Sequence, residues 1–140
     1  MIYLLDTNVC IGYLRLPRSV VGQKLTAQQP HDVALCSIVK SELIYGAAHS
    51  QRPVQQLEQL EQFFAPYVSL PFDDEAAVIA GQVRAELAAK GTPIGPYDLQ
   101  IAAIALAHNL VLVTHNTREF KRVLGLSIED WERDDTTDHP

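Results

Sequence analysis

Four acidic side chains stand where a parallel α/β sheet would gather them for chemistry. Asp6 directly follows a run of four apolar residues, and three more acids lie in comparable places later in the chain: Glu42, Asp98 and Glu119. All four are predicted to fall at or just beyond strand ends, and in open α/β sheets ligands gather outside the carboxyl ends of the strands. If the connections are short and right-handed, the four acids share one rim of the sheet.

A cluster of carboxylates at one rim predicts a bound metal ion. Crowded like charges repel each other, and a hard divalent cation relieves that repulsion. An all-oxygen donor set suits Mg²⁺ or Mn²⁺, whereas zinc requires cysteine or histidine ligands, which this cluster lacks. Such a cation activates water and neutralises charge on a phosphoryl group. The predicted chemistry is therefore in-line displacement at phosphorus without a covalent nucleophile.

Two of these acids also have a structural interpretation at a helix start. Asp6 or Thr7 could simply cap the helix that follows, and Asp98 would sit in the first turn of another helix, where the dipole stabilises a negative charge. A third acidic group, Asp73-Asp74-Glu75, precedes a helix and is predicted to be a cap rather than a metal site.

The other two acids likewise have alternatives. Glu42 could be a surface residue paired with Lys40 or with a neighbouring element. Asn116 followed three residues later by Glu119 forms a capping-box pattern, in which Glu119 would bind the backbone of Asn116. The residues alone leave these alternatives open.

Hydrophobic patterning predicts the elements that position the acids. Short apolar runs predict buried strands over residues 2–5, 33–36, 67–70 and 110–113, and a short edge strand over 127–131. Helical periodicity predicts helices over residues 9–15, 20–29, 38–50, 54–65, 76–90 and 97–108, with Ser19 and Ser37 as N-caps. Because strands and helices alternate, the predicted fold class is α/β, with a mainly parallel central sheet flanked by helices.

Length and composition fit one globular domain. The chain of 140 residues is 47% hydrophobic, and its apolar runs are too short to span a membrane. Met1 leads directly into the first predicted strand, which leaves no room for a secretory leader, so we expect a cytoplasmic protein. Cys10 and Cys36 are predicted to be buried thiols. We expect the domain to cover residues 1–131 and an acidic, disordered tail to cover 132–140.

Net charge does not decide the substrate. The chain carries a charge of −6, but six acids oppose one arginine in the last twelve residues, a local charge of −5. The remaining −1 includes the clustered acids, whose charge a divalent cation would partly neutralise. Charge therefore neither supports nor excludes a nucleic-acid substrate.

Four sequence blocks together resemble the PIN domain of VapC toxins. They are Leu4-Leu5-Asp6-Thr7-Asn8, residues 37–46, Pro96-Tyr97-Asp98 continuing to residue 103, and residues 113–120. The resemblance extends over essentially the whole chain up to Trp131. It implies a PIN-like, Rossmann-like sandwich and a metal-dependent endoribonuclease that is the toxic half of a toxin-antitoxin pair.

The resemblance also implies roles for single residues. The four acids named above would be catalytic, and Asp6 and Asp98 resemble direct magnesium ligands. Thr7 and Asn116 would support the acids through hydrogen bonds. His115 stands where relatives often have asparagine, so the resemblance assigns it no role.

Partners follow from the same resemblance. Toxins of this kind are usually homodimers held inactive by a VapB antitoxin. VapC toxins with these four sequence blocks resemble toxins that cut tRNA in the anticodon region. The resemblance therefore implies tRNA cleavage and arrest of translation. Apolar side chains of the early helices are the expected antitoxin-binding surface: Ile11, Leu14, Leu57 and Leu60.

Other function classes fit the sequence less well. A haloacid dehalogenase-type phosphohydrolase needs a second aspartate two residues after the first, where this chain has Asn8. A receiver domain needs a lysine after its last strand, whereas the last strong strand candidate here leads into acids. Another metal-dependent phosphohydrolase, or a non-enzymatic binding module whose carboxylates are only helix caps, remains an alternative.

Overall fold

Five short parallel strands form the central sheet. The computed structural model describes residues 1–133, and its strands are β1 (Tyr3–Leu5), β2 (Val33–Cys36), β3 (Val68–Leu70), β4 (Val111–Val113) and β5 (Ile128–Glu129). Their order across the sheet is β3-β2-β1-β4-β5, and every pairing is parallel. The α/β prediction is thus confirmed. All but the first two residues of the predicted tail, 132–140, lie outside the described residues.

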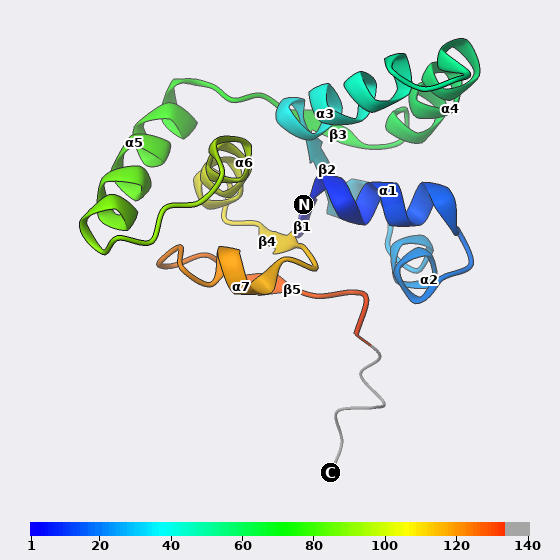
Figure 1. The fold of residues 1–140 in the computed structure, drawn as a ribbon. Coiled ribbons are helices and arrows are strands. Elements are labelled where there is room, and N and C mark those ends of the chain that lie inside the picture. Colours follow the sequence, from blue (N-terminus) through cyan, green and yellow to red (C-terminus); the bar gives the residue numbers. More distant parts are fainter. Residues whose placement is uncertain (134–140) are drawn as a thin grey trace.

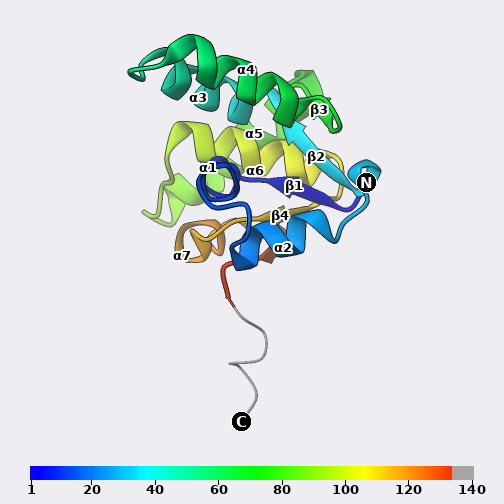
Figure 2. The same ribbon diagram turned by 90° about the vertical axis from the view of Figure 1, so that its right-hand side faces the viewer.

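Helices connect successive strands. They are α1 (Thr7–Arg15), α2 (Val20–Thr26), α3 (Ser37–Ala48), α4 (Pro53–Phe64), α5 (Asp74–Ala89), α6 (Pro96–Ala107) and α7 (Thr117–Phe120), with a 3₁₀ turn over Pro30–Asp32. Figures 1 and 2 agree that α1 and α2 lie on one side of the sheet and that α5 and α6 lie on the other. The helical pair α3 and α4 stands beside β2 and β3.

The core lies between the sheet and these helices. Strand residues such as Leu4, Leu35 and Leu112 have no exposed surface, because parallel strands covered on both faces are buried on both faces. Helix α6 is apolar nearly all round, and its residues 101–105 are all fully buried. This burial fixes the register of α6, and hence the position of its first turn, against the sheet.

Most predicted boundaries are confirmed to within two residues, with local exceptions. The second helix ends at Thr26 instead of Gln29, and the edge strand is limited to residues 128–129. The N-cap assignment of Ser37 is wrong: β2 runs directly into α3, so Cys36 is the N-cap and Ser37 is already helical. The Ser37 hydroxyl instead accepts a hydrogen bond from the backbone N–H of Phe72 at 3.3 Å.

The two cysteines are free and buried, as predicted. Burial raises the pKa of the Cys36 thiol to about 11 and raises that of Cys10 as well. Both side chains therefore stay protonated and behave as small apolar groups. None of the helices in residues 1–133 is long and apolar enough to cross a membrane.

Helix α5 supplies a test of the predicted acidic cap. The Asp73 carboxylate accepts a hydrogen bond from the N–H of Ala76 at 3.0 Å. Replacing Asp73 with Ala leaves that N–H without its cap, and we expect a loss of about 1 kcal/mol, or about 3 °C in Tm. Thermal unfolding followed by circular dichroism measures it. Asp74→Ala is the control, with a smaller loss, and an unchanged Tm in Asp73→Ala would contradict the capping role.

Candidate active site

Asp6 lies at the junction of β1 and α1 and is only 4% exposed. Its Oδ1 accepts the N–H of Thr7 at 2.8 Å, which caps α1, and its Oδ2 accepts the Thr114 hydroxyl at 2.8 Å. Burial raises the pKa of Asp6, and the hydrogen bonds from Thr114 and Thr7 oppose that rise. The capping interpretation is therefore correct for one oxygen, while the other is held by Thr114, the residue directly after β4.

Glu42 lies on α3 and is linked to Asp6 through one residue. The Thr7 hydroxyl donates to Glu42 Oε1 at 2.9 Å. The structure does not pair Glu42 with Lys40. The Lys40 ammonium instead lies over the ring of Phe64, 4.8 Å from its centroid. Thr7 thus bridges the acids of two neighbouring strand ends.

Asp98 reaches the same rim by a different route from the predicted one. It does not follow a strand: α6 comes after α5, and Asp98 is in its first turn. Since β4 follows α6 after only three residues, the helix runs back against the sheet and begins at the rim where β4 ends. The prediction that all four acids follow strand ends is therefore wrong for Asp98, although its placement at the rim is correct.

Glu119 lies on α7 and is fixed by two donors. Gly95 donates its backbone N–H to Oε1 at 2.8 Å, and the side-chain amide of Asn116 donates to Oε2. The capping-box interpretation is wrong, because Glu119 binds the Asn116 side chain instead of its backbone. A Cβ on residue 95 would lie in ordinary contact with both acids, 3.5 Å from an Asp98 oxygen and 3.8 Å from Oε1 of Glu119, so the loop at Gly95 lies next to both.

Electrostatics show that the four acids share one environment. The pKa of Asp98 is raised to about 7 by burial, by the negative charges of Glu119 and Asp6, by a hydrogen bond with Glu119 and by Glu42. For Glu119, burial acts to raise the pKa, but the donors Gly95, Asn116 and Asp98 together lower it. Burial and the surrounding negative charge therefore favour the protonated form of Asp98 in the metal-free protein.

The donor set fits a hard divalent cation. It consists of carboxylate oxygens supported by hydroxyl and amide groups, with no thiolate or imidazole among them. In residues 1–133, no three of these acids bring ligand oxygens within 4.8 Å of one another. The fit to Mg²⁺ therefore rests on the oxygen donor type, and Mg²⁺ in proteins is commonly held by one or two carboxylates together with several waters.

Sequence analysis missed three residues that organise the site. Thr114 is fully buried, binds Asp6 and also accepts the N–H of Asn116 at 3.0 Å. The sequence could have identified Thr114, because it is the first polar residue after an apolar strand. Gly95 and Arg122 are different: the Arg122 guanidinium donates to the Pro93 carbonyl at 3.1 Å and so ties the loop before α6 to the region of α7. Only the tertiary structure reveals these contacts.

Comparison with known proteins finds relatives over nearly the whole chain. The PIN domain family matches residues 3–126. A tRNA(fMet)-specific endonuclease VapC from Salmonella typhimurium is 43% identical, over 92% of this chain and 97% of the relative. Ribonuclease VapC2 from Rickettsia felis is 37% identical, over 95% of this chain and 100% of the relative. The crystal structure of DNA-bound VapBC from Salmonella typhimurium matches with a TM-score of 0.89 at 42% identity, over 94% of this chain and 98% of that one.

The raised pKa of Asp98 predicts how stability depends on pH without metal. The folded protein keeps a proton that the unfolded chain loses near pH 4, so stability falls as pH rises from about 4 to about 7. Asp98→Asn removes this cost. Allowing for solvent screening, we expect a gain of about 1 kcal/mol, or about 3 °C in Tm, above pH 7 and none at pH 4.

Calorimetry in the presence of a chelator measures this effect. Asp74→Asn changes an exposed acid at the start of α5 and should give no pH-dependent gain. A lower Tm for Asp98→Asn than for the unchanged protein at pH 8 would contradict the crowding of charge at the rim.

Proposed function

The chain belongs to the PIN-domain family and, within it, to the VapC ribonucleases, and from this membership we propose that it is an Mg²⁺-dependent endoribonuclease. In this proposal it is the toxin of a VapBC-type toxin-antitoxin pair. The observation that carries the proposal is the convergence of four carboxylates at one rim of a parallel sheet. They come from the N-cap of α1, the second turn of α3 and the first turns of α6 and α7. A set of independent helix caps would have no reason to share one electrostatic environment.

Each of the four acids has a role in this proposal. Asp6 and Asp98 would hold Mg²⁺, or Mn²⁺ in its place, and Glu42 and Glu119 would accept hydrogen bonds from the attacking water. When bound, the cation supplies an activated water and neutralises charge on the phosphoryl group. Thr7 and Thr114 keep Asp6 and Glu42 in place, while Asn116 orients Glu119.

We propose tRNA as the substrate, cut in the anticodon region, with inhibition of translation as the consequence. Support comes from the Salmonella typhimurium relative, whose name specifies tRNA(fMet), at 43% identity over nearly the full length of both chains. The blocks around the four acids, which carry the family resemblance, are all present in this chain.

A VapB-type antitoxin is the proposed partner, in keeping with the VapBC complex that this chain resembles. A groove of about 420 Å³ lies between α1, α3 and α4, and its apolar lining includes Ile11, Leu14 and Leu60. Leu57, also expected on this surface, packs against the core and is not part of the lining. Glu42 borders the same groove, so an occupant would lie next to the acids. We also propose that the toxin is a homodimer.

Metal-dependent cleavage is the direct test of the enzyme. The purified protein should cleave RNA from a total RNA pool in the presence of Mg²⁺ or Mn²⁺. Cleavage should stop when excess EDTA is added. Asp98→Asn should lower the rate by at least about 100-fold, since a metal-held charge contributes several kcal/mol to the transition state. Asp74→Asn is the matched control with full activity. End mapping identifies the RNA and the bond, and undiminished cleavage in EDTA would refute the proposal.

The groove makes a separate prediction about the antitoxin. Leu14→Glu puts a charge into its apolar lining and should abolish co-purification with the product of an adjacent short reading frame, because that charge would be buried in the complex. RNA cleavage should persist. Val78→Glu, at a 61% exposed position on α5, is the control that keeps the complex. Equal complex formation by both variants would show that the antitoxin binds elsewhere.

A further inference from the structure

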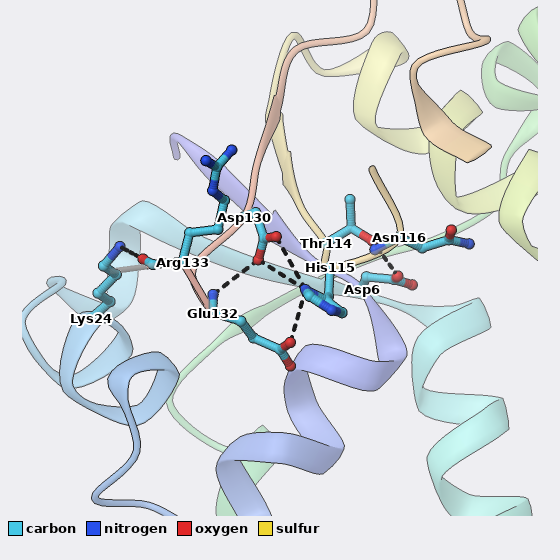
Figure 3. A network of polar contacts seen from close by, with 8 residues as sticks. All are labelled: Asp6, Lys24, Thr114, His115, Asn116, Asp130, Glu132 and Arg133. Carbon is cyan, nitrogen blue, oxygen red and sulfur yellow. Dashed lines mark hydrogen bonds and ion pairs between the residues drawn. The ribbon is translucent and has the colours of Figure 1, made fainter. Parts of the chain in front are cut away.

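A second group of potential metal ligands lies beside the acids but is distinct from them. His115 follows Thr114 at the end of β4, and Asp130 and Glu132 come from the segment after β5. Figure 3 shows the His115 ring directed toward both carboxylates. Its Nδ1 lies 2.8 Å from Glu132 Oε2 and 3.1 Å from Asp130 Oδ2.

One nitrogen of the imidazole faces more carboxylate oxygens than a single proton can bind well. Nδ1 also lies 3.3 Å from Asp130 Oδ1, so one ring nitrogen faces three carboxylate oxygens. A single N–H can donate well to only one of them. A metal ion can bind all the side chains at once, and one ligand atom from each lies within 4.8 Å of the others. Bonds of about 2.0–2.2 Å require donors somewhat over 3 Å apart, so small side-chain movements would admit the ion.

The carboxylates are held in place from behind. Trp131, between them in the sequence, is buried against the edge of Tyr3, with ring centroids 5.1 Å apart, and its indole N–H donates to Glu129 at 3.1 Å. The Asp130 side chain is only 10% exposed, and its Oδ1 accepts the N–H of Glu132 at 3.0 Å. Hydrogen-bonded carboxylates on an anchored segment are typical support for metal ligands.

We propose that His115, Asp130 and Glu132 form a second metal site, selective for Zn²⁺ over Mg²⁺. The imidazole nitrogen determines this selectivity, because Zn²⁺ binds nitrogen well whereas Mg²⁺ prefers oxygen alone. His115 is 62% exposed and Glu132 38%, so the ion has an entry path and water can complete the coordination. The bound ion would cross-link the end of β4 to the segment after β5.

The location connects this site with the four acids. His115 lies between Thr114, which binds Asp6, and Asn116, which binds Glu119. Zn²⁺ on His115 therefore restrains the loop from which two of the four acids receive their hydrogen bonds. The proposal does not depend on RNA cleavage, and its test involves no RNA.

Isothermal titration of the full chain with Zn²⁺ tests the proposal. Asp98→Asn is the background and excess Mg²⁺ is present, so that the carboxylate cluster does not take up zinc. We expect one Zn²⁺ per chain. Adding His115→Asn should weaken binding by at least about tenfold, because it removes the only nitrogen ligand.

His31→Asn is the matched control. His31 is 72% exposed with its Nε2 3.6 Å from an Asp32 oxygen, but it belongs to no three-ligand group in the described chain. It should leave Zn²⁺ affinity unchanged. In the protein that retains His115, Asp130 and Glu132, the NMR signals of the His115 ring should shift when Zn²⁺ is added. That shift would place the ion at this site. Absence of stoichiometric binding, or equal affinity with and without His115, would show that the three side chains form only a protonated ion-pair cluster.

Discussion

Repulsion among four carboxylates at one rim is the constraint on which the rest of this structure depends. Without a cation, this repulsion raises the pKa of Asp98, and N–H and O–H groups donate hydrogen bonds to the other acids. Thr7 and Thr114 serve the pair on β1 and α3, while Gly95 and Asn116 serve Glu119. These donors hold the acids in position but do not neutralise them. The rim therefore keeps a negative charge that a bound cation would neutralise.

The parallel sheet brings the four acids together because all of its strands end on the same side. Helices α1 and α3 begin directly at strand ends, and α7 begins a few residues after β4. Among the four helices associated with the acids, α6 alone follows another helix, and the burial of residues 101–105 fixes its first turn at the rim. Ionisation of Asp98 destabilises the metal-free fold, but α6, which carries Asp98, is fully buried over residues 101–105, so a site that costs stability can be retained.

Local patterns predicted the five strands, the helices α1 to α6 and three of the four acid positions, because each depends on neighbours within one turn or one strand. They failed where distant segments decide. Asp98 is at the rim because of how α6 returns to the sheet, and Glu119 binds Gly95 from a loop more than twenty residues earlier. Ser37 resembled a cap only because the direct junction of β2 and α3 leaves no signal in the sequence. The convergence of His115 with Asp130 and Glu132 likewise requires β4 and β5 to be paired.

The central claim is that the four acids form one site for a divalent cation. Anomalous diffraction from a crystal soaked in Mn²⁺ tests it most directly, because the scattering locates the ion without reference to activity. The account predicts a Mn²⁺ peak within bonding distance of Asp6 and Asp98. Full diffraction quality with no peak at that rim, at Mn²⁺ concentrations that support cleavage, would contradict it.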